Sequence, residues 1–248
     1  MTIKINPKYE SLRKFVEHLE EHFATDEGRL IHKGRNLVKV FRVEGYELNV
    51  KAYCVPRFFN QIVYRWLRKP KGLRAYINPQ LLRAKGFESP EEVAYIEERC
   101  GLLMGRSYFV SIQCPYSRNF YEFGDANASA SADIIQAFAV YAARLHEAGI
   151  LHRDFSPGNI LFDKLGDHYH FSLVDTNRMQ FGTVSVQAGC ANFARLWGQK
   201  TFFEILAKAY AKERGVNEAW CKSLMMKYRR IFWTRFSRRH KVKYHLDL

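Results

Sequence analysis

The sequence predicts an α+β protein with two lobes, in which a small β-rich N-terminal lobe is followed by a mainly helical C-terminal lobe. Two observations favour this class. Strand-like segments are concentrated before residue 115, whereas helical periodicity dominates after it. One inserted hairpin interrupts the helical half. We therefore expect lobes over residues 1–115 and 116–248, divided near the break at Cys114-Pro115-Tyr116.

In the N-terminal lobe, residues 8–23 show the apolar spacing of one amphipathic helix. Residues 37–43 and 46–53 alternate around Glu44-Gly45 and predict a β-hairpin, in which Lys51 points away from the apolar face. Residues 57–85 are helical in tendency, with interruptions expected at Pro70, Gly72 and Pro79. Further strands are expected over 93–96 and 108–113.

In the C-terminal lobe, a helix is predicted from Ile134 to Leu145, with Gly149 near its C-cap. Two short strands follow, over residues 159–163 and 169–175, joined through Gly166-Asp167. The apolar spacing then predicts one helix over 193–210 and a last one over 224–236, whose apolar stripe leaves out Met226 and Trp233.

The chain of 248 residues has a formal net charge of +14, which implies an anionic partner: nucleic acid, a membrane surface or a phosphorylated substrate. Residues 222–243 hold nine Lys or Arg and no acid, and a second basic cluster surrounds Tyr64, Trp66 and Leu67. Each segment is either a solvated helix face or a binding surface, for example for anionic lipid. We find no motif of a known nucleic-acid-binding module, so nucleic acid is not an expected partner.

Membrane spans and metal or disulfide frameworks are not indicated. No run of 18 apolar residues occurs, and the first residues lack the apolar core of a signal peptide, which predicts a cytoplasmic protein. The five cysteines are odd in number and have no CxxC spacing, so they are expected to be reduced thiols.

The residues that carry chemistry lie around the predicted hairpin. Phosphoryl transfer requires a carboxylate that orients the attacking hydroxyl, metal ligands and a cation on the phosphates. Asp154 lies in the loop His152-Arg153-Asp154-Phe155-Ser156-Pro157-Gly158-Asn159, and Asn159 enters the first strand. Asp175 ends the second strand, so hairpin pairing is expected to bring it beside Asn159.

This loop resembles the H-R-D-x-x-x-x-N catalytic loop of protein kinases, and Asp175 resembles the Asp of D-F-G. From Lys33 to Trp197 the chain is similar to the lipopolysaccharide core kinase family, which phosphorylates Kdo or heptose sugars. The resemblance implies a protein-kinase-like fold, with His152, Arg153 and Asp154 as catalytic residues and Asp154 as the base. It also implies ATP as substrate and Mg²⁺ bound by Asn159 and Asp175.

Two nucleotide-binding candidates lie in the N-terminal lobe. Lys51 resembles the strand lysine of V-A-I-K, although strand lysines are often only solvated. Gly34 stands alone where kinases carry a glycine-rich loop, so it forms either a phosphate cradle or a plain turn. Residues 69–85 contain no acid to pair with Lys51, which leaves Asp175 as one alternative partner.

The sequence also departs from ordinary protein kinases. Asp175-Thr176-Asn177 replaces D-F-G, no A-P-E follows, and Ser156 stands where protein-serine kinases place a lysine. We therefore expect an ATP-dependent kinase acting on a sugar hydroxyl of a lipid-linked acceptor, peripheral on the inner face of the cytoplasmic membrane. The alternatives are a kinase for a protein or soluble small molecule and a catalytically silent kinase-like scaffold.

Overall fold

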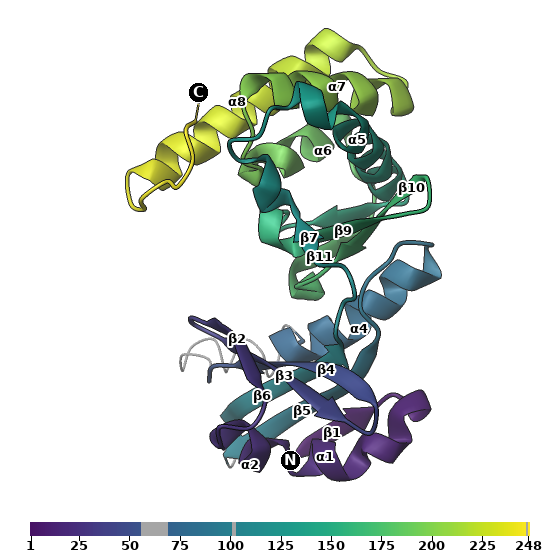
Figure 1. Cartoon of the computed structure of the whole chain (residues 1–248), viewed down its shortest axis with the longest axis vertical. Helices are drawn as coiled ribbons and strands as arrows, with labels where there is room; N and C mark the ends of the chain where they lie inside the picture. Colours follow the sequence, from purple (N-terminus) through teal and green to yellow (C-terminus); the bar gives the residue numbers. More distant parts are fainter. Residues whose placement is uncertain (56–68, 101–102, 247) are drawn as a thin grey trace. The chain divides into compact units, whose positions relative to one another are not determined.

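The computed structural model describes residues 1–55, 69–100, 103–246 and 248, and it divides into two compact units, Met1–Pro115 and Tyr116–Leu248 (Figure 1). The N-terminal unit is built on an antiparallel sheet and the C-terminal unit is mainly helical. The predicted α+β class is therefore confirmed. Each unit has its own core and is described by itself.

The sheet of the N-terminal unit has the order β1-β5-β6-β4-β3-β2. Its strands are β1 (Thr2–Ile5), β2 (Arg29–Lys33), β3 (Leu37–Val43), β4 (Tyr46–Tyr53), β5 (Glu92–Cys100) and β6 (Leu103–Ile112). The predicted hairpin over 37–53 is confirmed, with β3 and β4 paired from Val43–Tyr46 to Leu37–Ala52. Glu44 and Gly45 both have positive φ, at 48° and 82°, as a two-residue turn between twisted strands requires.

The predicted single helix over residues 8–23 is wrong in its continuity. The segment forms three short pieces: η1 (Pro7–Leu12), α1 (Arg13–Glu17) and α2 (Leu19–Ala24). The chain leaves helical geometry at His18, where φ is −102° and ψ is 16°. The predicted apolar residues Leu12, Phe15 and Leu19 nevertheless pack in the core against the sheet. Breaking the helix lets the segment curve along the sheet and bury them.

Helix α4 (Lys71–Ala84) runs through Gly72 and Pro79, so the interruptions predicted at these two residues are wrong. A proline inside a helix removes one backbone hydrogen bond, and packing of α4 on β5 and β6 offsets this loss. Gly72 permits the packing, because a Cβ there would lie 2.6 Å from the Tyr95 ring. Most of the helical tendency before Pro70, with the basic cluster around Trp66, falls outside the described residues.

The C-terminal unit surrounds two small sheets with helices. Strands β7 (Arg118–Asn119), β9 (Ile160–Leu165) and β10 (His168–Leu173) form one sheet, and β8 (Ile150–His152) pairs with β11 (Met179–Phe181) in the other. The long helices are α5 (Ala132–Glu147), α7 (Lys200–Glu213) and α8 (Glu218–Ser237), with a shorter α6 (Val186–Asn192). The short turns are η2 (Phe120–Phe123), η3 (Ser129–Ser131), η4 (Pro157–Asn159), η5 (Thr176–Arg178) and η6 (Phe193–Arg195).

The helix predicted over residues 193–210 is also divided. Leu196 is extended after η6, with ψ of 139°, and Gln199 is extended before α7 begins at Lys200. The break turns Phe193 and Phe203 into the same core from different directions, and both are fully buried.

The packing face of α8 matches the predicted apolar stripe only at Met225. Its buried residues are Cys221, Met225, Arg229 and Trp233, at intervals of four, and Trp233 is only 1% exposed. The prediction that Trp233 lies off the packing face is therefore wrong. Ile231, predicted in the stripe, is 39% exposed. Within the described part of the chain, no helix is both long and apolar enough to cross a membrane.

Candidate active site

The predicted catalytic loop lies in the C-terminal unit, between β8 and the β9–β10 hairpin. His152 ends β8, Pro157 begins η4, and Asn159 ends η4 one residue before β9. Asn159 donates from Nδ2 to the backbone carbonyl of Asp154 across 2.9 Å. This bond closes the loop on itself, so Asp154 and Asn159 are held together as the sequence predicts.

His152 is fully buried and connects the loop to the second hairpin strand. Its Nδ1 accepts from the backbone N–H of Asp154 at 3.1 Å, so Nε2 carries the proton and donates to the carbonyl of Val174 at 3.0 Å. Burial lowers the pKa of His152, against the opposing effect of the Asp175 and Asp154 carboxylates. The ring therefore positions the loop, and a catalytic role for His152 stays a prediction.

The hairpin brings Asp175 to the same place. Strands β9 and β10 pair from Leu165–His168 to Ile160–Leu173, and the N–H of Val174 donates to the carbonyl of Asn159 at 3.1 Å. Asp175 then adopts a left-handed conformation, with φ of 54°, and accepts a hydrogen bond from the Asn177 amide. Positive φ is unusual for a residue other than glycine and is frequent at functional turns.

Two arginines that the prediction of site residues does not include contact Asp154. Arg195 Nη1 lies 2.8 Å from Oδ1, and Arg178 Nη1 lies 3.3 Å from Oδ2. Arg178 comes from η5, three residues after Asp175, and Arg195 comes from η6. The carboxylate is 21% exposed, so it remains accessible beside its two partners. Arg178 lies three residues after Asp175, so a sequence motif around Asp175 can include it. Nothing in the sequence marks Arg195 as a site residue.

Arg153, between His152 and Asp154, contributes its backbone to the site. Its backbone N–H donates to the carbonyl of Arg178 at 3.3 Å, which joins the loop to η5. Its side chain is exposed. A catalytic role for this side chain stays a prediction.

The Mg²⁺ ligands can be tested against the donors present. Among the described residues, no group of three or more His, Cys, Asp or Glu could hold a metal ion. Mg²⁺ does not require such a group, because it commonly binds through one or two carboxylates together with phosphates and water. A carboxylate at Asp175 and an amide oxygen at Asn159 are donors of the type that requirement needs, and the hairpin brings the backbone before Asp175 to Asn159.

Lys51 and Gly34 belong to the N-terminal unit. Lys51 lies on the central strand β4, opposite Val38 on one side and Phe109 on the other, with Nζ 5.4 Å from the Tyr53 ring centre. Gly34 is in the exposed turn between β2 and β3, and its N–H donates to the carbonyl of Asn36 at 3.2 Å. Nucleotide binding by these residues stays a prediction, as does pairing of Lys51 with Asp175.

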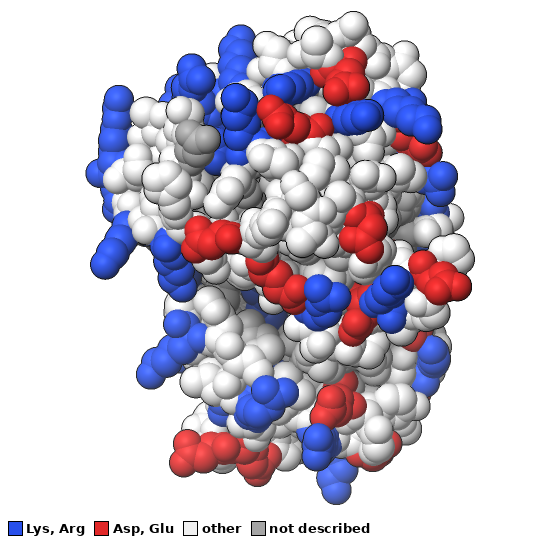
Figure 2. Space-filling model, turned by 45° about the horizontal axis from the view of Figure 1, so that its top comes forward, with Lys and Arg blue, Asp and Glu red and all other residues white. Residues whose placement is uncertain are grey.

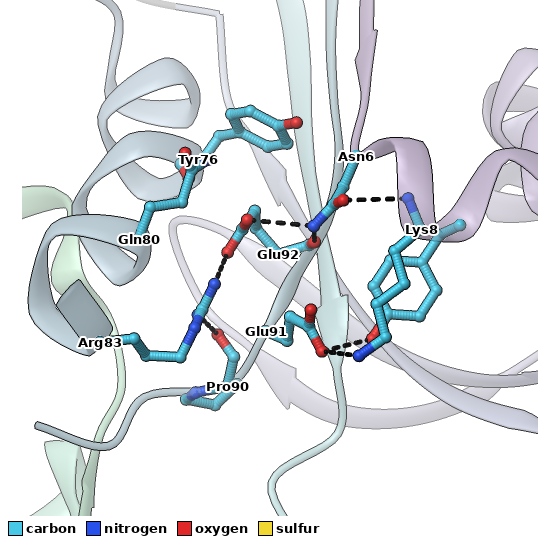
Figure 3. A network of polar contacts seen from close by, with 9 residues as sticks. Asn6, Lys8, Tyr76, Gln80, Arg83, Pro90, Glu91 and Glu92 are labelled. Carbon is cyan, nitrogen blue, oxygen red and sulfur yellow. Dashed lines mark hydrogen bonds and ion pairs between the residues drawn. The ribbon is translucent and has the colours of Figure 1, made fainter. Parts of the chain in front are cut away.

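In protein kinases the helix after the strand lysine carries an acid that pairs with it. Helix α4 carries a cation instead. It contains no acid, and its Arg83 instead donates to Glu92 of β5 and, at 3.3 Å, to the carbonyl of Pro90 (Figure 3). Glu92 is 3% exposed and also accepts from Asn6 at 3.1 Å. The helix supplies the cation and the strand the anion, so this pair fastens α4 to the sheet.

These features define a kinase-like protein: an antiparallel sheet unit, a helical unit, and an H-R-D loop that leads into a hairpin carrying Asn159 and Asp175. The chain belongs to the lipopolysaccharide kinase (Kdo/WaaP) family, whose model matches residues 21–228. This range extends the likeness predicted for residues 33–197 in both directions. Membership supports a phosphotransferase of lipopolysaccharide biosynthesis.

A solved structure shares the fold. The structure described as WaaP in complex with acyl carrier protein is similar over 94% of this chain and 100% of its own, with a TM-score of 0.60 and 16% sequence identity. At that identity the likeness concerns the fold alone. No curated protein matches the chain.

Proposed function

We propose that this protein transfers the γ-phosphate of ATP to a hydroxyl of a Kdo or heptose sugar in the lipopolysaccharide core. The observation that carries the proposal is the convergence of Asp154, Asn159 and Asp175 in a member of this kinase family. Phosphoryl transfer depends mainly on positioning and charge stabilisation, which these groups provide.

In this mechanism Asp154 accepts a hydrogen bond from the acceptor hydroxyl and orients it toward the γ-phosphorus. Arg178 and Arg195 hold the carboxylate from two sides and restrict its rotation. Asn159 and Asp175 would hold Mg²⁺, and the ion would neutralise charge on the transferred phosphate. Lys51 contacts the phosphates of ATP, as its likeness to the V-A-I-K lysine implies.

The protein acts at the inner face of the cytoplasmic membrane, where its acceptor is anchored. The support is its net charge of +14, because basic side chains near an anionic leaflet each contribute roughly 1 kcal/mol of attraction. In Figure 2, Lys and Arg side chains gather along the left of the upper half, the side on which α8 ends in Figure 1.

Mass spectrometry of lipopolysaccharide from cells with and without the protein tests the proposed function. We expect one phosphate on a core sugar to be lost with the protein and restored by the wild type, but not by Asp154→Ala. An unchanged core, together with ATP turnover on a soluble metabolite or a protein, would favour a kinase for that substrate. An unchanged core with no ATP turnover would favour a silent scaffold.

A further inference from the structure

A chain of hydrogen bonds crosses the core of the C-terminal unit and ends on the candidate catalytic loop. Asn192, the last residue of α6, donates from Nδ2 to the backbone carbonyl of His152 at 2.9 Å. Its Oδ1 lies 3.1 Å from Nε2 of His146 on α5, and Nδ1 of the same ring lies 2.9 Å from the hydroxyl of Tyr210 on α7. Arg214 completes the chain, since its Nη1 donates to that hydroxyl at 3.0 Å.

The donors of this chain all point toward the loop. A backbone carbonyl can only accept, so the amide nitrogen of Asn192 faces His152 and its Oδ1 is left to accept from His146. His146 therefore carries its proton on Nε2, and its Nδ1 accepts from the Tyr210 hydroxyl. Burial lowers the pKa of His146 to about 4, so the ring keeps this neutral form near neutral pH. Each member orients the next, and a change at Tyr210 reaches the loop through Asn192.

The chain is enclosed by the helices that form it. Tyr210 is fully buried and His146 is 1% exposed. Gly189, three residues before Asn192 on α6, permits their contact, because a Cβ there would overlap the Tyr210 hydroxyl oxygen and lie 2.8 Å from His146 Nδ1. A polar group buried in this way cannot turn to solvent when its partner is lost, so the chain has one stable arrangement.

His152 connects this chain to the candidate site. Its ring accepts from the backbone N–H of Asp154 at 3.1 Å and donates to the carbonyl of Val174 at 3.0 Å. Asn192 also directly precedes η6, which supplies Arg195 to the Asp154 carboxylate. The segment from Asn192 to Arg195 therefore holds the loop twice, through the backbone of His152 and through the carboxylate of Asp154.

We propose that Asn192 is a positioning residue for phosphoryl transfer, which fixes the backbone of His152 and thereby the Asp154 carboxylate, and that His146 and Tyr210 act through it. The proposal rests on the proposed kinase function and extends it to residues that no sequence motif marks. Because these side chains orient the loop without binding a substrate, their loss should lower kcat and leave KM unchanged.

Transfer kinetics with ATP and lipopolysaccharide core test this in Asn192→Ala, Tyr210→Phe and their double variant. We expect Asn192→Ala to lower kcat about tenfold or more, because small misplacements of reacting groups are costly, with both KM values within about twofold of the wild type. Tyr210→Phe should lower kcat in the wild type but cause no further loss in the Asn192→Ala background. Leu206, one turn before Tyr210 on α7, is equally buried and lies outside the chain, so Leu206→Val should lower stability and leave kcat unchanged.

Hydrogen exchange of the peptide over residues 150–160 gives a second readout that does not require activity. Exchange in this peptide should become faster in Asn192→Ala and stay at the wild-type rate in Leu206→Val. An unchanged kcat in folded Asn192→Ala, an equal effect of Tyr210→Phe in both backgrounds, or unchanged exchange of the peptide would overturn the proposal. A wild type that transfers no phosphate would reject the proposed function instead, and faster exchange in Asn192→Ala would then retain Asn192 as the support of the loop.

Discussion

At the scale of single residues, Asp154 is held by two arginines, Arg178 and Arg195. Replacing it with alanine removes the group that orients the acceptor hydroxyl, so kcat should fall by about 10²–10⁴-fold. Circular dichroism should show a folded protein, because Asp154 is partly exposed and its two arginines can turn to solvent. Activity near the wild-type level in the folded variant would remove Asp154 from the mechanism.

His146 makes stability depend on pH. It is buried on α5, where Nδ1 accepts from the Tyr210 hydroxyl at 2.9 Å and Nε2 donates to Asn192 at 3.1 Å. Burial lowers its pKa from 6.5 to about 4. Between pH 6.5 and 4, His146 therefore binds a proton in the unfolded chain but not in the folded protein. The free energy of unfolding falls as pH decreases through this window.

The shift corresponds to about 3 kcal/mol of unfolding free energy for this one group. Urea unfolding between pH 7 and 4.5 should show the decrease. His146→Gln can keep a neutral polar partner and should flatten the part of the profile that His146 causes. An identical pH profile in this variant would assign the dependence to other groups.

At the scale of structural elements, the β9–β10 hairpin positions Asn159 and Asp175, the two predicted metal ligands. Asn159→Ala and Asp175→Ala should each weaken ATP binding measured with Mg²⁺, and Asp175→Ala should weaken it more, because a carboxylate neutralises the ion and an amide does not. Calorimetry with and without Mg²⁺ separates the metal from the nucleotide. Asp167→Ala, in the exposed turn of the same hairpin, is the control. Unchanged Mg-ATP affinity in the Asp175 variant would exclude it as a ligand.

The contact between α4 and β5 depends on a largely buried charge. Arg83→Met leaves Glu92, whose side chain is 4% exposed, without its cation. Hydrogen bonds to charged groups contribute about 1.5–3 kcal/mol, so we expect a loss of that size in the free energy of urea unfolding. Lys8→Met breaks the neighbouring pair of Lys8 with Glu91. The two side chains are 62% and 30% exposed, so solvent screens the pair and the loss should be smaller than for Arg83→Met. Equal losses in the two variants would mean that the burial of Glu92 does not decide the effect.

At the scale of the whole molecule, the positive charge is available for a surface only where it is exposed. Arg229 is not: it is 1% exposed and donates to the carbonyl of Gly198 at 2.7 Å, so the sequence-based view of it as a solvated or lipid-facing charge is wrong. Arg230, Arg238, Lys241 and Lys243 are exposed. Replacing these four with glutamine should release the protein from vesicles containing anionic lipid.

The same attraction should depend on salt. Exposed charges are screened beyond about 8 Å at physiological ionic strength, so wild-type vesicle binding should fall steeply from low to moderate salt. Sedimentation with neutral and anionic vesicles measures it. Because Trp233 is buried, it is not available for the insertion that salt-independent binding would require.

Local patterns in the sequence determined much of this protein. The β3–β4 hairpin, the β9–β10 hairpin and the spacing from His152 to Asn159 could all be predicted, because alternation, turn residues and motif spacing act over a few residues. The tertiary structure decided which face of α8 is buried, where the helices over 8–23 and 193–210 break, and which arginines reach Asp154. Arg195 is separated from Asp154 by 41 residues, and only the packing of η6 brings them together. Helical periodicity locates an apolar stripe but does not choose its partner, so the whole α8 stripe could be expected in the core, whereas Met225 is buried there and Ile231 is exposed.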